Sequence, residues 1–311
     1  MCVASPPTRR STAWSFRGSA ARLCHARDVT SVEWALEDVA KRWPVPDAGD
    51  DKYSRGTLGV VAGSEAYPGA AVLVVSGAVR AGAGLVRFVG PRRAQDLVLG
   101  ARPEAIVHDS ADAAETLPRA RAWVVGPGVA DYPEQDAAIG SVAASGLPMV
   151  VDAGALESVA VARAAGSREA AADRVLLTPH AGELIRTLGA LRHDVTRADV
   201  EHDRGGHARL LAETARATVL LKGSVTVIAS PGGALIWLPE APPWLATAGS
   251  GDVLAGVAGS LLAAGLSAAE AGACAAFMHA RAGALASAGG PIAALDIAEN
   301  LPLAIGDMLE H

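Results

Sequence analysis

A short run of small residues and one aspartate stands directly before an apolar segment with helical spacing. The run is Gly249-Ser250-Gly251-Asp252, and apolar side chains recur on one helical face over residues 253–262. A loop of small residues that opens a helix leaves backbone N–H groups unpaired, and the helix dipole makes them a site for phosphate. An aspartate there can take the proton from a hydroxyl group that attacks the phosphorus. The run therefore predicts a phosphoryl-transfer site, with Asp252 as general base and the three residues before it as N–H donors.

The same run has a second interpretation, in which it is purely structural. Asp252 then only caps the helix, and the glycines only turn the chain. The rest of the chain has to decide between the two.

Strands and helices alternate from residue 52 onward. Short apolar runs end in glycine or polar residues, and runs of small residues with helical spacing follow them. This order is typical of a parallel sheet. We therefore expect an α/β fold, a three-layer sandwich with a mostly parallel central sheet flanked by helices. The expected strands are residues 58–63, 85–89, 105–108, 122–125, 148–152, 175–178, 219–221, 225–229 and 234–238, the last two forming a hairpin, and the expected helices include residues 69–83, 252–264, 267–287 and 293–309.

Small or chemically active residues follow several of the expected strands. They are Gly63-Ser64, Gly126-Pro127-Gly128, Asp152, His180 and Lys222. In open α/β sheets, ligands bind just beyond the carboxyl ends of the strands. The purely structural interpretation does not predict this accumulation, so the pattern favours a ligand site at that edge.

Composition narrows the classes of partner. The chain of 311 residues carries a net charge of −6, which argues against nucleic acid or an anionic membrane as the main partner. Glycines break the uncharged residues 253–269, so we expect a buried helix and a turn there rather than a membrane span. The three cysteines, Cys2, Cys24 and Cys274, show no spacing typical of zinc sites and favour a reducing, cytoplasmic setting.

The chain is expected to have two parts. Residues 1–45 form an N-terminal extension, partly disordered, with a short amphipathic helix within residues 32–42. Residues 46–311 form one domain, because residues 50–311 contain neither a linker nor an internal repeat.

Seven stretches, in order along the chain, match one known family. The two most specific are the Tyr67-Pro68-Gly69-Ala70 element and the Pro179-His180-Ala181-Gly182-Glu183 element. The full set is residues 52–57, 62–70, 125–128, 151–156, 178–183, 221–226 and 248–256. From Lys52 to its end the chain resembles the NAD(P)H-hydrate dehydratase family, of the ribokinase-like fold. It departs from the family pattern at Ser250, where threonine is usual, and at Ala181, where proline is usual.

The resemblance implies an enzyme of metabolite repair. The implied substrate is the 6-hydroxy hydrate of NADH or NADPH, in its S epimer. A nucleotide phosphorylates the C6 hydroxyl, and phosphate, a better leaving group than hydroxide, then departs and restores NAD(P)H. The resemblance also implies ADP (or ATP) as the donor, Mg²⁺ and a cytoplasmic homotetramer. Residues 1–50 are too few for the epimerase domain fused in some members, so a stand-alone dehydratase domain is expected.

The resemblance further assigns roles to individual residues. The nucleotide site corresponds to Lys222, Gly223, Ser224, Val225, Thr226 and Gly251, the substrate pocket to Ala70, Gly128, His180 and Asp252, and the Mg²⁺ site to Glu183.

Several of these residues also have structural interpretations. Lys222 can be a solvated lysine at a strand end, and His180 can be a structural histidine. Glu183 can cap the helix that follows it, and Asp152 can form a turn rather than belong to the outer shell of a metal. His279 lies in an apolar helical run and is expected in the core.

Two other functions compete with the repair enzyme. A small-molecule kinase of the same fold, acting for example on hydroxyethylthiazole, would share Asp252 and the phosphate loop but would not need the two specific elements. A non-catalytic nucleotide-binding module would need no general base at all.

Overall fold

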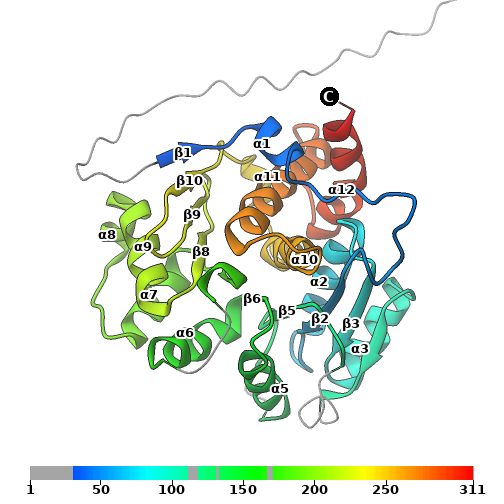
Figure 1. Ribbon diagram of the computed structural model, residues 1–311, viewed down its shortest axis with the longest axis horizontal. Helices are drawn as coiled ribbons and strands as arrows, with labels where there is room; N and C mark the ends of the chain where they lie inside the picture. Colours follow the sequence, from blue (N-terminus) through cyan, green and yellow to red (C-terminus); the bar gives the residue numbers. More distant parts are fainter. Residues whose placement is uncertain (1–30, 111–117, 131–132, 167–170, 311) are drawn as a thin grey trace, which may run out of the picture.

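A ten-stranded β-sheet runs through the centre of the computed structural model (Figure 1). The structure describes residues 31–110, 118–130, 133–166 and 171–310. The strands are β1 (Ser31–Glu33), β2 (Thr57–Val61), β3 (Leu85–Val89), β4 (Ile106–His108), β5 (Ala122–Val125), β6 (Met149–Val151), β7 (Val175–Leu177), β8 (Thr218–Leu221), β9 (Val227–Ala229) and β10 (Leu235–Trp237). Their order across the sheet is β1-β10-β9-β8-β7-β6-β5-β2-β3-β4. Only β9 runs against its neighbours, so the sheet is mostly parallel and the expected hairpin is confirmed.

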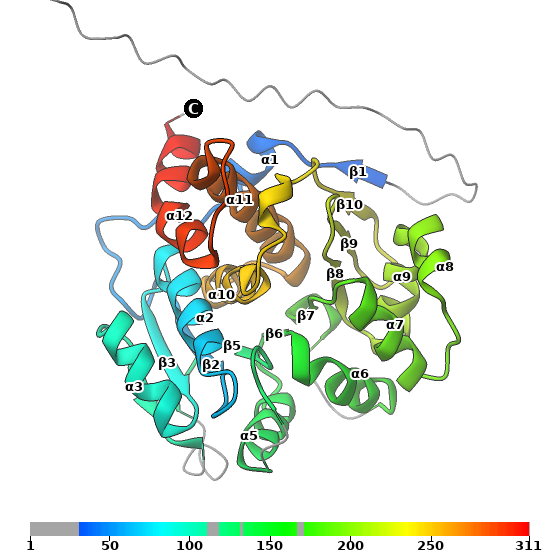
Figure 2. The same ribbon diagram turned by 180° about the vertical axis from the view of Figure 1, so that it is seen from behind.

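Helices cover both faces of this sheet, as views from opposite sides show (Figures 1 and 2). They are α1 (Leu36–Ala40), α2 (Gly69–Arg80), α3 (Arg92–Ala101), α5 (Pro133–Ala144), α6 (Leu156–Ala164), α7 (Ala181–Ala190), α8 (Arg197–His202), α9 (Arg204–Ala215), α10 (Ser250–Ala263), α11 (Ala268–Ser287) and α12 (Ala294–Leu309). Three short 3₁₀ turns lie at Ala153–Ala155, Ala172–Arg174 and Pro243–Leu245. Helices α2, α10, α11 and α12 pack on one face, and α5, α6, α7 and α9 pack on the other. This arrangement confirms the three-layer α/β sandwich.

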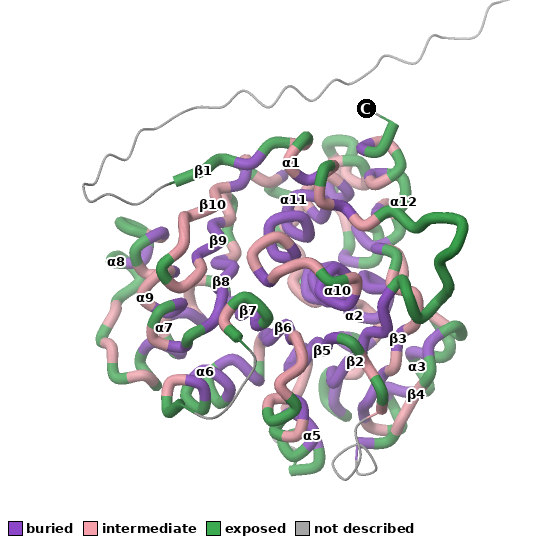
Figure 3. The backbone as a smooth tube through the Cα atoms, in the orientation of Figure 1, coloured by how far each residue is buried: buried purple, intermediate pink, exposed green. Residues whose placement is uncertain are grey.

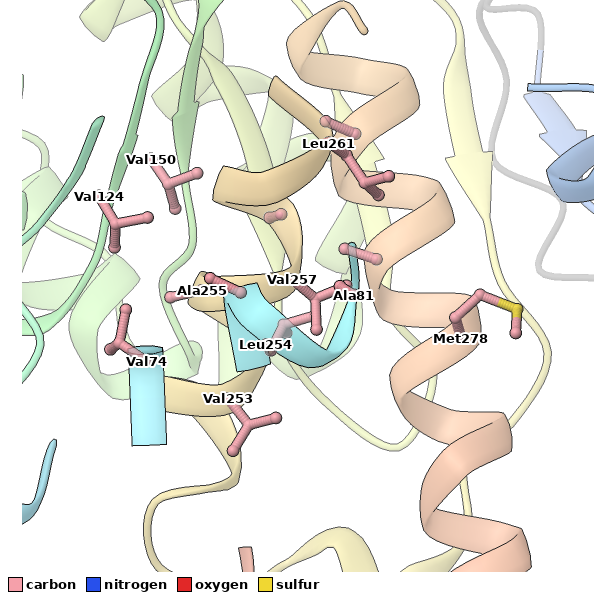
Figure 4. Close-up of a cluster of buried hydrophobic side chains, with 14 of the residues drawn as sticks. Val74, Ala81, Val124, Val150, Val253, Leu254, Ala255, Val257, Leu261 and Met278 are labelled. Atoms are coloured by element: carbon pink, nitrogen blue, oxygen red, sulfur yellow. The ribbon is translucent and has the colours of Figure 1, made fainter. Parts of the chain in front are cut away.

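Side-chain alternation along the strands divides the core in two. Val124 and Val150 point to the face that carries α10, whereas Val125 and Val151 point to the other face. Figure 4 shows Val124 and Val150 beside the apolar side chains of α10. Each strand of this part of the sheet is therefore buried on both sides, as parallel strands between two helical layers must be.

Helix α10 is buried along most of its length (Figure 3). A Cβ atom at Gly256 would lie 2.1 Å from the carbonyl oxygen of Val74, so glycine lets α10 contact the backbone of α2. The chain then turns at Gly265, whose φ of +106° favours glycine. The expected buried helix and turn are confirmed. In the described ranges, no helix combines the length and the apolar character that crossing a membrane requires.

The segment before residue 46 packs on the domain. Strand β1 adds to the sheet edge by pairing parallel with β10. Trp34, Val39 and Trp43 are buried in the core. The helix expected within residues 32–42 is shorter, at Leu36–Ala40, because the residues before it join the sheet. Residues before the expected domain boundary at residue 46 are thus part of the packed domain. Residues 1–30 of the expected extension lie outside the described residues.

Candidate active site

The carboxyl ends of β6, β7 and β8 and the start of α10 meet at one edge of the sheet. Asp152 follows β6, His180 follows β7 and Lys222 follows β8. A parallel bridge joins His180 and Lys222 beyond the regular strands. A Cβ atom at Gly251, in the first turn of α10, would lie 3.4 Å from Lys222 Nζ and 3.9 Å from Asp152 Oδ2. The fold therefore brings the glycine run of α10 against the strand ends.

Lys222 is the cation of this site. Its Nζ donates a hydrogen bond to Asp152 Oδ1 at 2.8 Å and lies 3.7 Å from Glu183 Oε2. Only 3% of the Asp152 side chain and 19% of the Lys222 side chain are exposed, so the pair is screened little by solvent. Burial alone lowers the pKa of Lys222, but the charges of Asp152, Glu183 and Asp252 outweigh it and raise the pKa above its ordinary value. Lys222 is an ammonium ion held among carboxylates rather than a solvated strand-end lysine.

The pKa of the Asp252 carboxyl is raised well above its ordinary value. Burial raises its pKa to about 7; the charges of Asp152 and Glu183 also raise it, and Lys222 lowers it. A general base works best when its pKa lies near the operating pH. The side chain is half-buried and lies close to the glycine run, since a Cβ atom at Gly249 would be 3.7 Å from Asp252 Oδ2.

The start of α10 has the geometry of an anion site. Gly249 has φ of +82°, in the left-handed region, and its α-carbon faces Leu73 so closely that a Cβ atom would lie 2.3 Å from Leu73 Cδ1. The left-handed φ favours glycine at this position, and the close approach shows that Leu73 packs against it. The N–H groups at the start of an α-helix have no intrahelical acceptor, so those of Gly251 and Asp252 are available to an anion. The expectation that Ser250 also offers its N–H is wrong, because this group donates to the carbonyl oxygen of Thr247 at 3.3 Å.

A buried histidine, His279 of α11, anchors this helix start. Its Nε2 lies 2.9 Å from the carbonyl oxygen of Ser250 and 3.2 Å from Ser250 Oγ. Burial lowers the pKa of His279 to about 4, so the imidazole is neutral at physiological pH. The expectation that His279 lies in the core is confirmed. Its bond to Ser250 was missed, and the only signal for it was a polar residue within an apolar helical run.

His180 and Glu183 form a reciprocal helix cap. The backbone N–H of Glu183 donates to His180 Nδ1 at 3.2 Å, and the backbone N–H of His180 donates to Glu183 Oε2 at 2.8 Å. The same Glu183 oxygen faces Lys222. Glu183 therefore caps α7 and belongs to the charged cluster at once, while 56% of the His180 side chain stays exposed at the site.

Two small residues bring the loops after β2 and β5 into contact. A Cβ atom at Gly128 would lie 2.4 Å from Ala70 Cβ and 3.0 Å from the carbonyl oxygen of Tyr67. The N–H of Gly63 donates to the carbonyl oxygen of Pro127 at 2.7 Å. Ala70 lies in the first turn of α2, the helix whose Leu73 packs against the glycine run, so this contact lies on the α2 side of Asp252.

The loop after β8 presents its backbone to solvent beside the cluster. Gly223 and Ser224 are exposed, and Val225 and Thr226 are half-buried. The N–H of Lys222 donates to the carbonyl oxygen of Pro179 at 2.8 Å, and the N–H of Ala241 donates to that of Ser224 at 2.8 Å. The loop is thus ordered at both sides and open in between.

A direct metal site is not assembled at this edge. Across the part of the chain that the structure describes, no three His, Cys, Asp or Glu side chains are grouped in a way that could hold a metal ion. Two of the carboxylates at the site, Asp152 and Glu183, already face the ammonium of Lys222.

Comparison with known proteins agrees with the sequence and the geometry. The family model described as NAD(P)H-hydrate dehydratase matches residues 58–302. The chain is 48% identical over 278 residues to the bifunctional NAD(P)H-hydrate repair enzyme Nnr of Mycobacterium leprae, covering 86% of this chain and 56% of that protein. It is 37% identical over 233 residues to the ADP-dependent (S)-NAD(P)H-hydrate dehydratase of Neisseria meningitidis serogroup B, covering 72% of this chain and 75% of that one. The chain spans about half the length of the bifunctional mycobacterial relatives that it matches.

Solved structures show the same relationship. The ADP/ATP-dependent NAD(P)H-hydrate dehydratase of Bacillus subtilis, co-crystallised with ATP/Mg²⁺, aligns with a TM-score of 0.80 and 29% identity, covering 91% of this chain and 100% of that one. A hydroxyethylthiazole kinase from Pyrococcus horikoshii aligns with a TM-score of 0.55 and 14% identity, a likeness of fold alone.

Proposed function

The chain belongs to the NAD(P)H-hydrate dehydratase family, and on this premise we propose that it uses an adenine nucleotide to dehydrate the S-6-hydroxy hydrate of NADH or NADPH. The observation that carries the proposal is Asp252 at the mouth of α10, with a pKa of about 7, beside unpaired helix amides and the ammonium of Lys222. This combination supplies a base, an anion site and a cation at one point, which suits phosphoryl transfer to a hydroxyl.

The first step of the proposed reaction is phosphoryl transfer. Asp252 accepts the proton of the C6 hydroxyl while the hydroxyl oxygen bonds to the terminal phosphorus of the nucleotide. The bond from that phosphorus to the bridging oxygen breaks. ADP thereby becomes AMP. The amides at the start of α10 bind the charge on the transferred phosphoryl group, and Lys222 adds a positive charge nearby.

The second step is elimination. The C6–O bond breaks with its electrons leaving on phosphate, the lone pair of the ring nitrogen assists, and a proton departs from C5. The products are NAD(P)H, inorganic phosphate and AMP. ADP as the donor is supported by the name of the Neisseria relative, and ATP is the alternative that the Bacillus relative suggests.

Ligand contacts follow from the placement of the loops. We assign the nucleotide to Lys222, Gly223, Ser224, Val225 and Thr226 with Gly251, and the hydrate to Ala70, Gly128, His180 and Asp252. The nucleotide assignment is supported by Lys222, which lies against Gly251. The hydrate assignment is supported by His180, which bridges to Lys222, and by Ala70, which contacts Gly128 and belongs to the helix whose Leu73 packs against Gly249.

The residues present fit a Mg²⁺ ion that is bound mainly through nucleotide phosphates and water. Asp152 and Glu183 offer carboxylate oxygens, the ligand type that Mg²⁺ prefers, but their contacts with Lys222 suit a role behind water molecules better than direct ligation. When bound, Mg²⁺ would neutralise charge on the phosphates. Glu183 is thus assigned to the outer shell.

The assembly and the cellular site are proposed as well. Leu285, Leu295, Leu303 and Leu309 of α11 and α12 are exposed, which supports burial between subunits of a homotetramer. Light scattering tests the tetramer. The cytoplasm is the proposed location, because NADH and NADPH are used there.

One assay tests the function. Purified protein is incubated with hydrated NADH, Mg²⁺ and either ADP or ATP, and the dihydronicotinamide absorbance and free phosphate are followed. Recovery of NADH with release of equal phosphate supports the repair reaction. A stable phosphorylated alcohol formed from hydroxyethylthiazole, with no NADH recovery, would instead identify a kinase.

A further inference from the structure

Arg204, the first residue of α9, bonds to the turn that follows β8. Its Nη2 donates to the carbonyl oxygen of Lys222 at 3.1 Å, and it also lies 3.5 Å from that of Leu221 and 3.4 Å from that of Val225. One guanidinium nitrogen therefore touches the backbone at both ends of the turn. A hydrogen bond from a charged donor is stronger than one from a neutral donor.

The guanidinium also lies against the middle of the turn. A Cβ atom at Gly223 would lie 2.4 Å from Arg204 Nη2 and 3.0 Å from Cζ. Burial lowers the pKa of the guanidinium, with Glu201 opposing the shift, so the group gives up hydration to occupy this position. The exposed residue Gly223 thus lies against a side chain from α9.

Lys222 itself does not depend on this contact. Its backbone N–H bonds to Pro179, and its ammonium bonds to Asp152. The N–H of Ala241 holds the carbonyl oxygen of Ser224, and Arg204 holds those of Lys222 and Val225 on either side of it. These backbone groups take no part in the charged cluster.

We infer that Arg204 is a positioning residue that holds the turn of residues 222–225 in the conformation that receives the nucleotide. The inference rests on the proposed function, in which this turn binds adenine nucleotide. According to this inference, the turn determines the affinity for the nucleotide, whereas Asp252 and the start of α10 determine the rate of the chemical step.

The test compares two arginines of α9. Arg204→Met removes the donor at the turn, whereas Arg209→Met removes a matched arginine whose Nη2 donates at 3.4 Å to the carbonyl oxygen of Gly233, in the β9–β10 turn. We expect Arg204→Met to raise the KM and the calorimetric Kd for ADP about tenfold, with kcat and the KM for the hydrate within about twofold. Arg209→Met is expected to match the unsubstituted protein. An unchanged nucleotide KM, an equal rise in the hydrate KM, or the same effect from Arg209→Met would overturn the inference.

A second variant tests the same contact in case Arg204→Met does not fold. Gly223→Ala places a methyl group where the guanidinium lies, and the flexible arginine can move away at small cost to the fold. It is expected to weaken ADP binding, and the double variant with Arg204→Met should bind ADP no more weakly than Arg204→Met alone. Additive losses would overturn the coupling. The calorimetric Kd for ADP tests the role of Arg204 even if the protein does not turn over the hydrate. A failure of the proposed function can therefore be distinguished from a failure of this inference. Absence of any ADP binding by the unsubstituted protein would overturn both.

Discussion

Lys222 Nζ donates a 2.8 Å hydrogen bond to Asp152 Oδ1, although the two residues are 70 positions apart in the chain. Both act on Asp252, because Asp152 raises its pKa and Lys222 lowers it. Burial is the largest cause of the raised pKa of Asp252, and a balance between these two neighbours of opposite charge then adjusts the protonation of the proposed base. The predictions below test this balance and the helix start that it faces.

Replacing Asp252 with Asn removes the base while leaving the amides of α10 in place. We expect kcat to fall by about 10²–10⁴-fold, the range that a positioned general base contributes. The Kd for ADP should stay within about threefold of the original, since the nucleotide loop is untouched. Rate assays and calorimetry on the same preparation measure both. Turnover close to the original rate would show that Asp252 is not the base.

The pH dependence of activity should change when the charge of Lys222 is removed. Asp252 accepts a proton only when ionised, so activity rises as pH passes upward through its pKa of about 7. Lys222 lowers that pKa, and Lys222→Met should therefore move the acidic limb of kcat/KM to higher pH. Lys41→Met, at an exposed position, serves as the control. A limb that stays in place, or moves to lower pH, would contradict the assigned coupling.

His279 should make stability depend on pH. Its pKa falls from 6.5 to about 4 on folding, so the unfolded chain binds more protons across this window. Stability is therefore lost as pH falls from 6.5 towards 4, by at most on the order of 3 kcal/mol. Denaturant unfolding at several pH values should show a smaller loss for His279→Gln than for the original. The half-buried His193, replaced in the same way, should leave the loss unchanged.

Replacing Gly249 with alanine should destabilise the start of α10. Gly249→Ala has to adopt a left-handed φ, and Leu73 has to move because its Cδ1 lies 2.3 Å from the new Cβ, so we expect a loss of about 1–3 kcal/mol and a marked fall in kcat. Gly140→Ala in α5 is the matched control, because a Cβ atom there has no neighbour within 4 Å. It should be neutral or stabilising by up to about 1 kcal/mol. Thermal melts and rate assays distinguish the two; an active, stable Gly249→Ala variant would refute the anion-site geometry.

Much of the fold could be read from local pattern. Runs of Val and Leu that end in glycine or a polar residue marked β5, β6 and β7, and the spacing of apolar residues marked α10 to α12. The start of α7 near Gly182 was expected, but α5, α6, α8 and α9 were not identified, because their faces mix alanine with charged residues and give a weak period. Strand β1 was missed for a different reason: an edge strand of three exposed residues has no burial pattern.

The sequence alone determined which residue types stand at the strand ends and that a glycine run with Asp252 opens a buried helix, since both depend on neighbours in the chain. The tertiary structure decided that Lys222 lies between Asp152 and Glu183, that His279 holds Ser250, and that Arg204 supports the turn after β8. These contacts join distant segments through strand order and helix packing, which local periodicity does not encode. The pKa of Asp252 follows from the same distances and burial, so it too becomes readable only once the chain is folded.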